Sequence, residues 1–190
     1  MRNLSRVSLA ALAVVAMLTG CVRSEPIHPP RSTSTPTPSA EPLFASDAEA
    51  LAAATAAYAA YLKVSDEILM QGGIHPERID AVTTKSWADI QAVSFREEHQ
   101  KGWVSSGGSR YDGMTLQTYD SDATVGSVAV AVYVCVDVSA VDVRDRNGVS
   151  VVSSDRPDRA PMEVSFERRN EESQDLLVSE EAPWSGLGTC

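Results

Sequence analysis

Basic residues are scarce in this chain. Its 190 residues include 16 Lys and Arg against 26 Asp and Glu, for a formal net charge of −10. Binding to nucleic-acid phosphates requires clustered Lys and Arg, and adhesion to anionic lipid by charge has the same requirement. The acidic balance therefore argues against nucleic acid as a partner and against membrane adhesion by charge alone.

Motifs of familiar catalytic and cofactor sites are also lacking. The chain has no GxGxxG, GxxxxGK[ST], HExxH or GxSxG pattern, and no Cys/His spacing suited to zinc. Residues 145–148 partly imitate a calcium loop, but Val143 occupies the position of its first acidic ligand. We therefore expect no catalytic residue, no cofactor and no metal.

No apolar run is long enough to span a bilayer, which takes about 20 residues. The N-terminus carries Arg2 and Arg6, and residues 7–18 are then apolar apart from Ser8. A positive start followed by a short apolar core is typical of a secretory signal peptide. We assign residues 1–20 to this signal peptide.

The signal peptide closes with Leu18-Thr19-Gly20-Cys21, and this segment resembles the lipobox of bacterial lipoproteins of the actinobacterial type. The resemblance implies cleavage before Cys21, after its sulfur has received a diacylglyceryl group carrying fatty acids such as palmitate. Two acyl chains anchor a protein stably, so the mature protein would sit on the outer face of the cell membrane. The alternative is a plain secretory signal with a chance cysteine.

The mature chain divides into a tether and one domain. Residues 21–45 begin with the lipidated Cys21, and the rest of this segment contains six prolines, seven Ser or Thr and one aromatic residue. Such a composition buries too little apolar surface to fold and predicts disorder or polyproline II. We expect a single folded domain over residues 46–190.

The first half of this domain has a helical pattern. Ser46 and Glu49 form a capping box, and apolar residues then recur at three- and four-residue steps until Gly72-Gly73. A short helix is expected after Pro76, with Ile79 and Val82 on its inner face. A third helix is expected up to Gly102, with an apolar face made of Trp87, Ile90, Val93 and Phe95.

The second half alternates as strands do. Short strands are expected at residues 103–104 and 114–119, with turns at Gly107-Gly108 and Asp112-Gly113. Residues 126–138 are apolar on both faces, which predicts a central strand. Asn147-Gly148 is a type I′ turn signal between residues 141–143 and 149–152. Two more strands are expected around residues 162–168 and 176–184.

Helices followed by strands predict an α+β fold, in which N-terminal helices pack on a curved antiparallel sheet. This order resembles the NTF2-like cone fold, through the helical front, the Val-rich strand with Cys135 and the final hairpin near Trp184. A cystatin-like arrangement would leave much the same pattern.

Three cysteines are present, and lipidation would occupy Cys21. Cys135 and Cys190 then form an even pair in an oxidising location, which predicts a disulfide. It would close a loop of about 55 residues and hold a terminus that would otherwise fray. A reactive thiol at Cys135 is the alternative, but this needs an electropositive setting, and its neighbours are apolar or acidic.

The resemblance to the cone fold also raises an enzymatic alternative, because some NTF2-like proteins are isomerases or dehydratases that use Asp, Tyr or His inside the cone. Asp137 is the foremost candidate base and Tyr133 the proton donor, since alternation puts both on one face of the central strand. Burial would raise the pKa of Asp137 unless a basic partner or solvent satisfies it. The candidates as a set are His75, Asp89, His99, Tyr111, Tyr119, Tyr133 and Asp137.

Four arginines near the last strands could form a basic spot or simply solvate a sheet edge; they are Arg156, Arg159, Arg168 and Arg169. Taken together, the sequence predicts a non-catalytic, membrane-anchored extracytoplasmic lipoprotein. Its domain is expected to bind a protein partner of the envelope or a small apolar ligand. The alternative is an NTF2-like isomerase or dehydratase that uses Asp137 and Tyr133.

The lipobox generates the first prediction. Cells fed a labelled fatty acid should incorporate the label into this protein in the membrane fraction, and Cys21→Ala should abolish it, because only the Cys21 sulfur is expected to form the thioether. Cys135→Ser serves as the control and should retain the label. Unlabelled wild-type protein in the culture medium would contradict the assignment.

Overall fold

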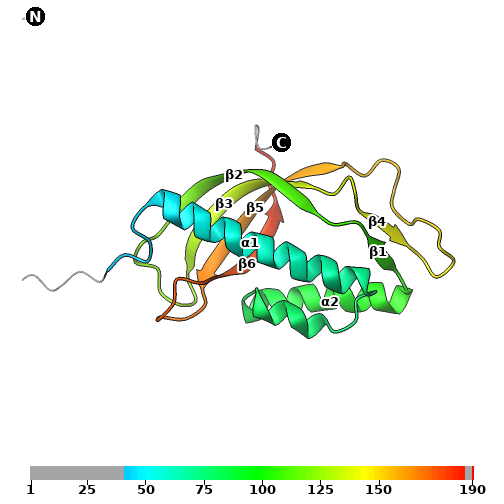
Figure 1. Ribbon diagram of the computed structural model, residues 1–190, viewed down its shortest axis with the longest axis horizontal. Coiled ribbons are helices and arrows are strands. Elements are labelled where there is room, and N and C mark those ends of the chain that lie inside the picture. The colour runs from blue at the N-terminus through cyan, green and yellow to red at the C-terminus, as the bar shows by residue number, and fades with distance from the viewer. Residues whose placement is uncertain (1–40, 187–189) are drawn as a thin grey trace, which may run out of the picture. The chain divides into compact units, whose positions relative to one another are not determined.

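The computed structural model describes residues 41–186 and residue 190 (Figure 1). The signal peptide, Cys21 and the predicted tether as far as residue 40 lie outside the described residues. The described chain forms helices packed against an antiparallel sheet, so the predicted α+β class is confirmed. None of its helices is both long and apolar enough to cross a membrane.

The helices come first along the chain, and the strands follow. The helical elements are α1 (Asp47–Met70), the 3₁₀ helix η1 (Pro76–Ala81) and α2 (Lys85–Lys101). The strands are β1 (Val104–Ser106), β2 (Arg110–Tyr119), β3 (Val128–Asp137), β4 (Asp142–Arg144), β5 (Arg159–Arg168) and β6 (Leu176–Pro183).

The main sheet has the strand order β2-β3-β5-β6 with every pair antiparallel, and β1 pairs separately with β4. Figure 1 shows α1 lying across one face of this sheet with α2 beside it, and the β1–β4 pair near the C-terminal end of α1. Strand β3 lies between β2 and β5, as its apolar composition predicts.

Both faces of β3 are packed. Val130, Val132 and Val134 are fully buried on the face toward the helices, and Ala131 and Cys135 are buried on the opposite face. This two-sided burial distinguishes β3 from an ordinary antiparallel strand with one wet face.

Helix α1 begins and ends at the predicted signals. The Ser46 Oγ accepts a hydrogen bond from the Glu49 backbone N–H at 3.3 Å, and the Glu49 carboxylate accepts from the Ala45 N–H at 3.0 Å. At the other end the Gly73 N–H donates to the Ile68 carbonyl at 3.0 Å. Gly73 has a φ of 72°, and a Cβ there would lie 2.1 Å from the Phe95 carbonyl oxygen, so this position requires glycine.

The predicted border at Ser46 lies a few residues too late. Leu43 and Phe44 are 6% and 5% exposed and belong to the core. The Tyr119 hydroxyl accepts from the Phe44 N–H at 2.6 Å and donates to the Phe44 carbonyl at 2.8 Å. Proline and serine dominate the segment before residue 45, so its composition hides the two apolar residues that anchor the start of the fold.

Two strand predictions are also corrected. Asp112-Gly113 is not a turn: it lies within β2, where the register shifts between Asp112 and Thr115 and Gly113 has a φ of 64°. The predicted type I′ turn at Asn147-Gly148 is wrong, because Asn147 does not have a positive φ and the Gly148 N–H donates to the Asp145 carbonyl at 2.9 Å. Residues 149–152 form only a single bridge at Ser150. Strand β4 pairs with β1 instead.

The apolar face predicted for the third helix is wrong in part. Ile90 and Val93 are 57% and 49% exposed, whereas Ala88 and Phe95 are buried. Gln91 lies between these two on the inward face and donates to the Tyr61 hydroxyl at 2.9 Å. Because the polar Gln91 finds a hydrogen-bond partner inside the fold, the inward face of α2 differs from the face that hydrophobicity alone predicts.

Cys135 and Cys190 lie at disulfide distance, with their Sγ atoms 2.08 Å apart, as predicted. Trp184 also lies against β3, because its ring stacks on Tyr133 with a centroid separation of 4.2 Å. The Trp184 N–H donates to the Pro161 carbonyl at 3.0 Å. The C-terminal residue is thus tied to the middle of the sheet.

The core position of Phe44 generates a prediction. Phe44→Ala should lower the free energy of unfolding by about 3 kcal/mol, because it leaves a cavity beside the Tyr119 ring, whose centroid lies 5.8 Å from that of Phe44. Urea denaturation measures this change. Glu41→Ala alters an exposed side chain in the same segment and should leave stability unchanged; equal effects of the two would contradict the corrected border.

The disulfide generates a third prediction. Replacing Cys135 and Cys190 with serine should lower the free energy of unfolding by up to about 4 kcal/mol, the chain-entropy value for a loop of this length. A compact denatured state would reduce the loss. A non-reducing peptide map of the mature protein should recover the linked peptides, and a readily alkylated Cys135 in native protein would contradict the pairing.

Candidate functional site

The most unusual group in the described chain is the carboxylate of Glu181, on the face of β6 toward the helices. The Tyr58 hydroxyl donates to its Oε1 at 2.5 Å, and the Tyr61 hydroxyl lies 3.1 Å from its Oε2. Both tyrosines come from α1 and are 0% and 3% exposed. Gln91 of α2 donates to the Tyr61 hydroxyl, so one cluster joins α1, α2 and β6.

A bulge in β6 places Glu181 there. Phe166 of β5 pairs with Val178 and Ser165 pairs with Glu180, which leaves Ser179 as an extra residue. Simple alternation from Leu176 and Val178 would turn Glu180 toward the helices. The extra residue reverses the alternation, so Glu180 is exposed and Glu181 points inward.

The surroundings of Glu181 disfavour its charge. Desolvation raises its pKa above the ordinary glutamate value, although the hydrogen bonds from Tyr58 and Tyr61 oppose the shift. Burial and the neighbouring Glu181 in turn raise the pKa values of Tyr58 and Tyr61. Both hydroxyls therefore keep their protons and serve as donors.

Polar atoms near this cluster lack partners. The indole N–H of Trp87 on α2 and the Ser179 hydroxyl on β6 are buried with no hydrogen-bond partner in the described part of the chain. Unpaired buried polar atoms are uncommon in folded proteins and are often satisfied by water. Sequence reasoning missed Glu181, because alternation selects Glu180 and only the bulge reverses that choice.

Asp137 and Tyr133, the predicted catalytic pair, each contact other side chains. Asp137 ends β3 beside Arg110 at 3.5 Å and Arg159 at 3.8 Å. Hydrogen bonds from Ser139 and then these two arginines lower the pKa of Asp137, the reverse of the shift that would tune a base. Tyr133 instead accepts from Gln117 at 2.5 Å and stacks on Trp184.

The other candidate residues lie in separate places. His75 is exposed before η1 with its ring 3.1 Å from Glu77, and the His99 ring lies 3.0 Å from the Gly72 carbonyl oxygen. Asp89 pairs with Lys85 on the surface of α2. Tyr111 donates to the Thr55 carbonyl, and Tyr119 holds the start of the domain. In residues 41–186 and 190 we find no cluster of three His, Cys, Asp or Glu that could hold a metal ion.

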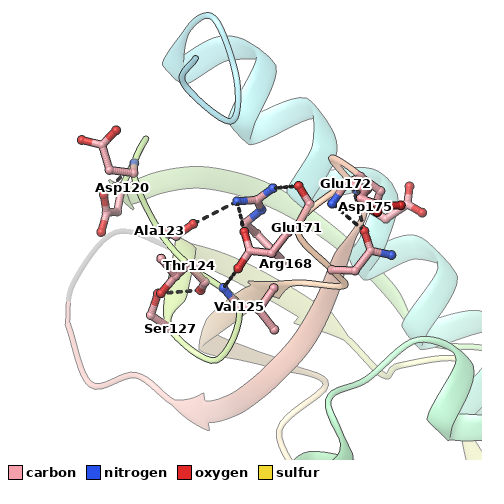
Figure 2. Close-up of polar contacts among 12 residues, drawn as sticks. Asp120, Ala123, Thr124, Val125, Ser127, Arg168, Glu171, Glu172 and Asp175 are labelled. Atoms are coloured by element: carbon pink, nitrogen blue, oxygen red, sulfur yellow. Dashed lines mark hydrogen bonds and ion pairs between the residues drawn. The ribbon is translucent and has the colours of Figure 1, made fainter. Parts of the chain in front are cut away.

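The four arginines do not form a basic spot, because each is used locally. Arg168 donates to the Ala123 carbonyl at 3.3 Å and to the Glu171 side chain at 3.0 Å, and Glu171 accepts from the Val125 N–H (Figure 2). This arrangement joins the β2–β3 loop to the β5–β6 loop. Arg156 donates to backbone carbonyls, Arg159 pairs with Asp112 and Asp137, and Arg169 bonds Ala81 and lies near Asp175.

An open groove of about 560 Å³ lies between the C-terminal half of α1 and the start of β2. Its apolar lining comes from Ala59, Leu62, Met70 and Tyr111, and Met70 is 40% exposed. Its charged lining residues are Lys63, Asp66, Glu67 and Arg110. Asp66 is satisfied internally, since it accepts from the backbone N–H and the hydroxyl of Ser109.

The hydrogen bonds to Glu181 generate a prediction. Tyr58→Phe keeps the edge contact with the Tyr111 ring but removes a donor to a half-buried carboxylate, so it should cost about 1–3 kcal/mol of stability. Tyr133→Phe removes a hydroxyl bonded to an exposed Gln117 and should cost less than 1 kcal/mol. Urea denaturation at one pH compares the free energies of unfolding of the two variants. Equal losses would show that the hydrogen bond to Glu181 adds no more stability than the one to Gln117.

Comparison with known proteins gives little further information. No family model and no curated protein matches the chain. The crystal structure of the intermembrane space region of the chloroplast protein ARC6 is similar with a TM-score of 0.49 and 12% sequence identity. The similarity covers 72% of this chain and 97% of that one.

Proposed function

We propose that this protein is a lipoprotein held on the outer face of the cell membrane through Cys21, and that its α+β domain is a non-catalytic binding module. Its partner is an envelope protein that docks in the groove beside α1. The observation that carries the binding half of the proposal is this open, largely apolar groove with a half-exposed methionine.

The pairing of the cysteines supports an extracytoplasmic location. Cys135 and Cys190 lie at disulfide distance, and disulfides persist in oxidising compartments. Cys21 is then the remaining cysteine, and it stands at the end of a short apolar leader after two small residues. A sulfur in that position is the atom that a diacylglyceryl group requires.

The packing of the interior favours a protein partner over a small apolar ligand inside the domain. Tyr58, Val132, Val164 and Phe166 fill the space between the helices and the sheet and are completely buried. The groove, in contrast, opens to solvent along α1. Methionine suits such a surface, because its flexible and polarisable side chain adapts to a partner.

The enzymatic alternative has less support. It requires Asp137 and Tyr133 to act on one substrate, but Asp137 is paired with arginines and Tyr133 is stacked on Trp184. A carboxylate whose pKa is lowered is a weak base, and the Tyr133 hydroxyl already accepts a hydrogen bond from Gln117.

The binding proposal is tested with a photo-crosslinking residue at position 70 in cells that make the full-length protein. We expect a protein adduct from position 70 and none from position 118, which is exposed on β2 outside the groove. The adduct partner, once purified, should bind the wild-type domain. An adduct with a small molecule, or adducts of equal yield from both positions, would contradict docking of an envelope protein in the groove.

Two alanines on α1 provide matched variants for the binding assay. Ala59 lines the groove and Ala60 beside it does not, and both are exposed. Ala59→Arg should fill the groove and weaken binding of the purified partner at least tenfold, whereas Ala60→Arg should leave it unchanged. Equal affinities of the two variants would place the binding surface elsewhere.

A further inference from the structure

The β1–β4 pair extends away from the main sheet, beyond the C-terminal end of α1 (Figure 1). The edge segment of this pair, residues 149–152, lies along the outer side of β4. Val149 and Val151 of the edge segment are 61% and 37% exposed and share one face, because side chains alternate along an extended chain. Folded proteins usually protect a free strand edge with charge, proline or a covering element, but residues 147–154 contain no charged residue and no proline. The edge segment is therefore unprotected.

The backbone of Ser150 faces away from β4. The Val149 carbonyl accepts from the Asp145 N–H, and the Val151 N–H donates to the Val143 carbonyl, both at 2.9 Å. Because backbone groups alternate along a strand, the N–H and the carbonyl of Ser150 point outward. Neither group has a hydrogen-bond partner in the described part of the chain. A further strand laid against this edge would give both of them partners.

The edge segment is complementary to itself. Val149-Ser150-Val151 reads the same in both directions, so an antiparallel pair with a two-fold axis at Ser150 puts Val149 of each copy opposite Val151 of the other. The two Ser150 residues then exchange both of their backbone hydrogen bonds. Like charges do not meet across this pair, because the segment is uncharged and, on the face of the Ser150 hydroxyl, Asp142 is paired with Arg144 at 2.8 Å. These features favour a second copy of the chain over an unrelated strand.

We propose that the edge segment is a self-association site, at which two copies of this chain pair antiparallel through residues 149–152 and join their β1–β4 sheets. In this pair the outward groups of each Ser150 gain partners, and the exposed valines of the two copies cover one another. The contact uses no residue that lines the groove beside α1, so it stands or falls independently of the docking proposed there.

The contact is small. Stable protein interfaces bury about 1,200–2,000 Å² in total, and a pair of such short segments covers less. The two copies therefore associate transiently, and covalent capture at the two-fold axis is the measurement that suits such a pair.

The first test places a cysteine on the two-fold axis, as Ser150→Cys, in cells that make the full-length protein. Residues that exchange hydrogen bonds across an antiparallel pair have Cα atoms about 5.5 Å apart, which a disulfide can span. Ser153→Cys is the control: Ser153 is exposed, but its two copies would lie about 20 Å apart, because each is three residues from the axis. Under mild oxidation we expect a disulfide-linked dimer from Ser150→Cys and at least tenfold less from Ser153→Cys. Equal yields, or no dimer from Ser150→Cys, would overturn the proposal.

The second test probes the register with two variants of the Ser150→Cys protein. The first variant carries Val149→Lys and Val151→Lys, which places like charges opposite each other in the proposed pair. The second carries Val149→Lys and Val151→Asp, which places opposite charges there. The first should give at least fivefold less dimer than the second. Simple relief of net repulsion predicts the reverse order, because the first variant is the less acidic of the two. A dimer yield from the first variant that equals or exceeds that from the second would overturn the proposal.

Discussion

Burial of β3 on both faces is the constraint around which this domain is organised. A strand whose two faces are apolar must find two covering layers, and hydrophobic burial of this kind is the main favourable term in folding. On one side, Val130, Val132 and Val134 pack under the helices. On the other side, where the described residues place no helix, Trp184 stacks on Tyr133 and Cys190 is bonded to Cys135. The second face of β3 is thus covered in part by residues from the C-terminal end of the chain.

The same organisation brings a carboxylate into the interior. Glu181 lies opposite Val164 on β5, which in turn lies opposite Val132 on β3, so an acid extends the row of buried valines toward the sheet edge. Only hydroxyls meet it there. A fold that depends on close packing around β3 thus contains one place where a carboxylate faces the helices and is held there by two tyrosine hydroxyls.

Charged residues elsewhere in the described chain mostly pair with nearby groups. Arg168 joins two loops at one end of the sheet, and Arg159 bridges Asp112 and Asp137 on neighbouring strands. These pairs are mostly exposed, so each is worth little by itself and serves mainly to fix loops and strand ends. The groove beside α1 differs from them, since its apolar lining is not covered by any part of the described chain.

Local signals in the sequence determined much of the fold. The capping box at Ser46, the stop at Gly72-Gly73, the two-sided apolar strand β3 and the final hairpin all follow from short-range chemistry, and each is present. The pairing of Cys135 with Cys190 followed from counting cysteines and from the expected location, which required no geometry.

Only the tertiary structure decided which of two adjacent glutamates faces the helices. Alternation along β6 points to Glu180, and a single extra residue at Ser179 turns the strand so that Glu181 faces the helices. A bulge arises from pairing with another strand, so it leaves no mark in the sequence of β6 itself. The same reason explains Phe44, which is held by Tyr119, and the inward face of α2, where Gln91 donates to a tyrosine hydroxyl 30 residues away. Residues whose environment is built by distant segments lie beyond what periodicity and composition can determine.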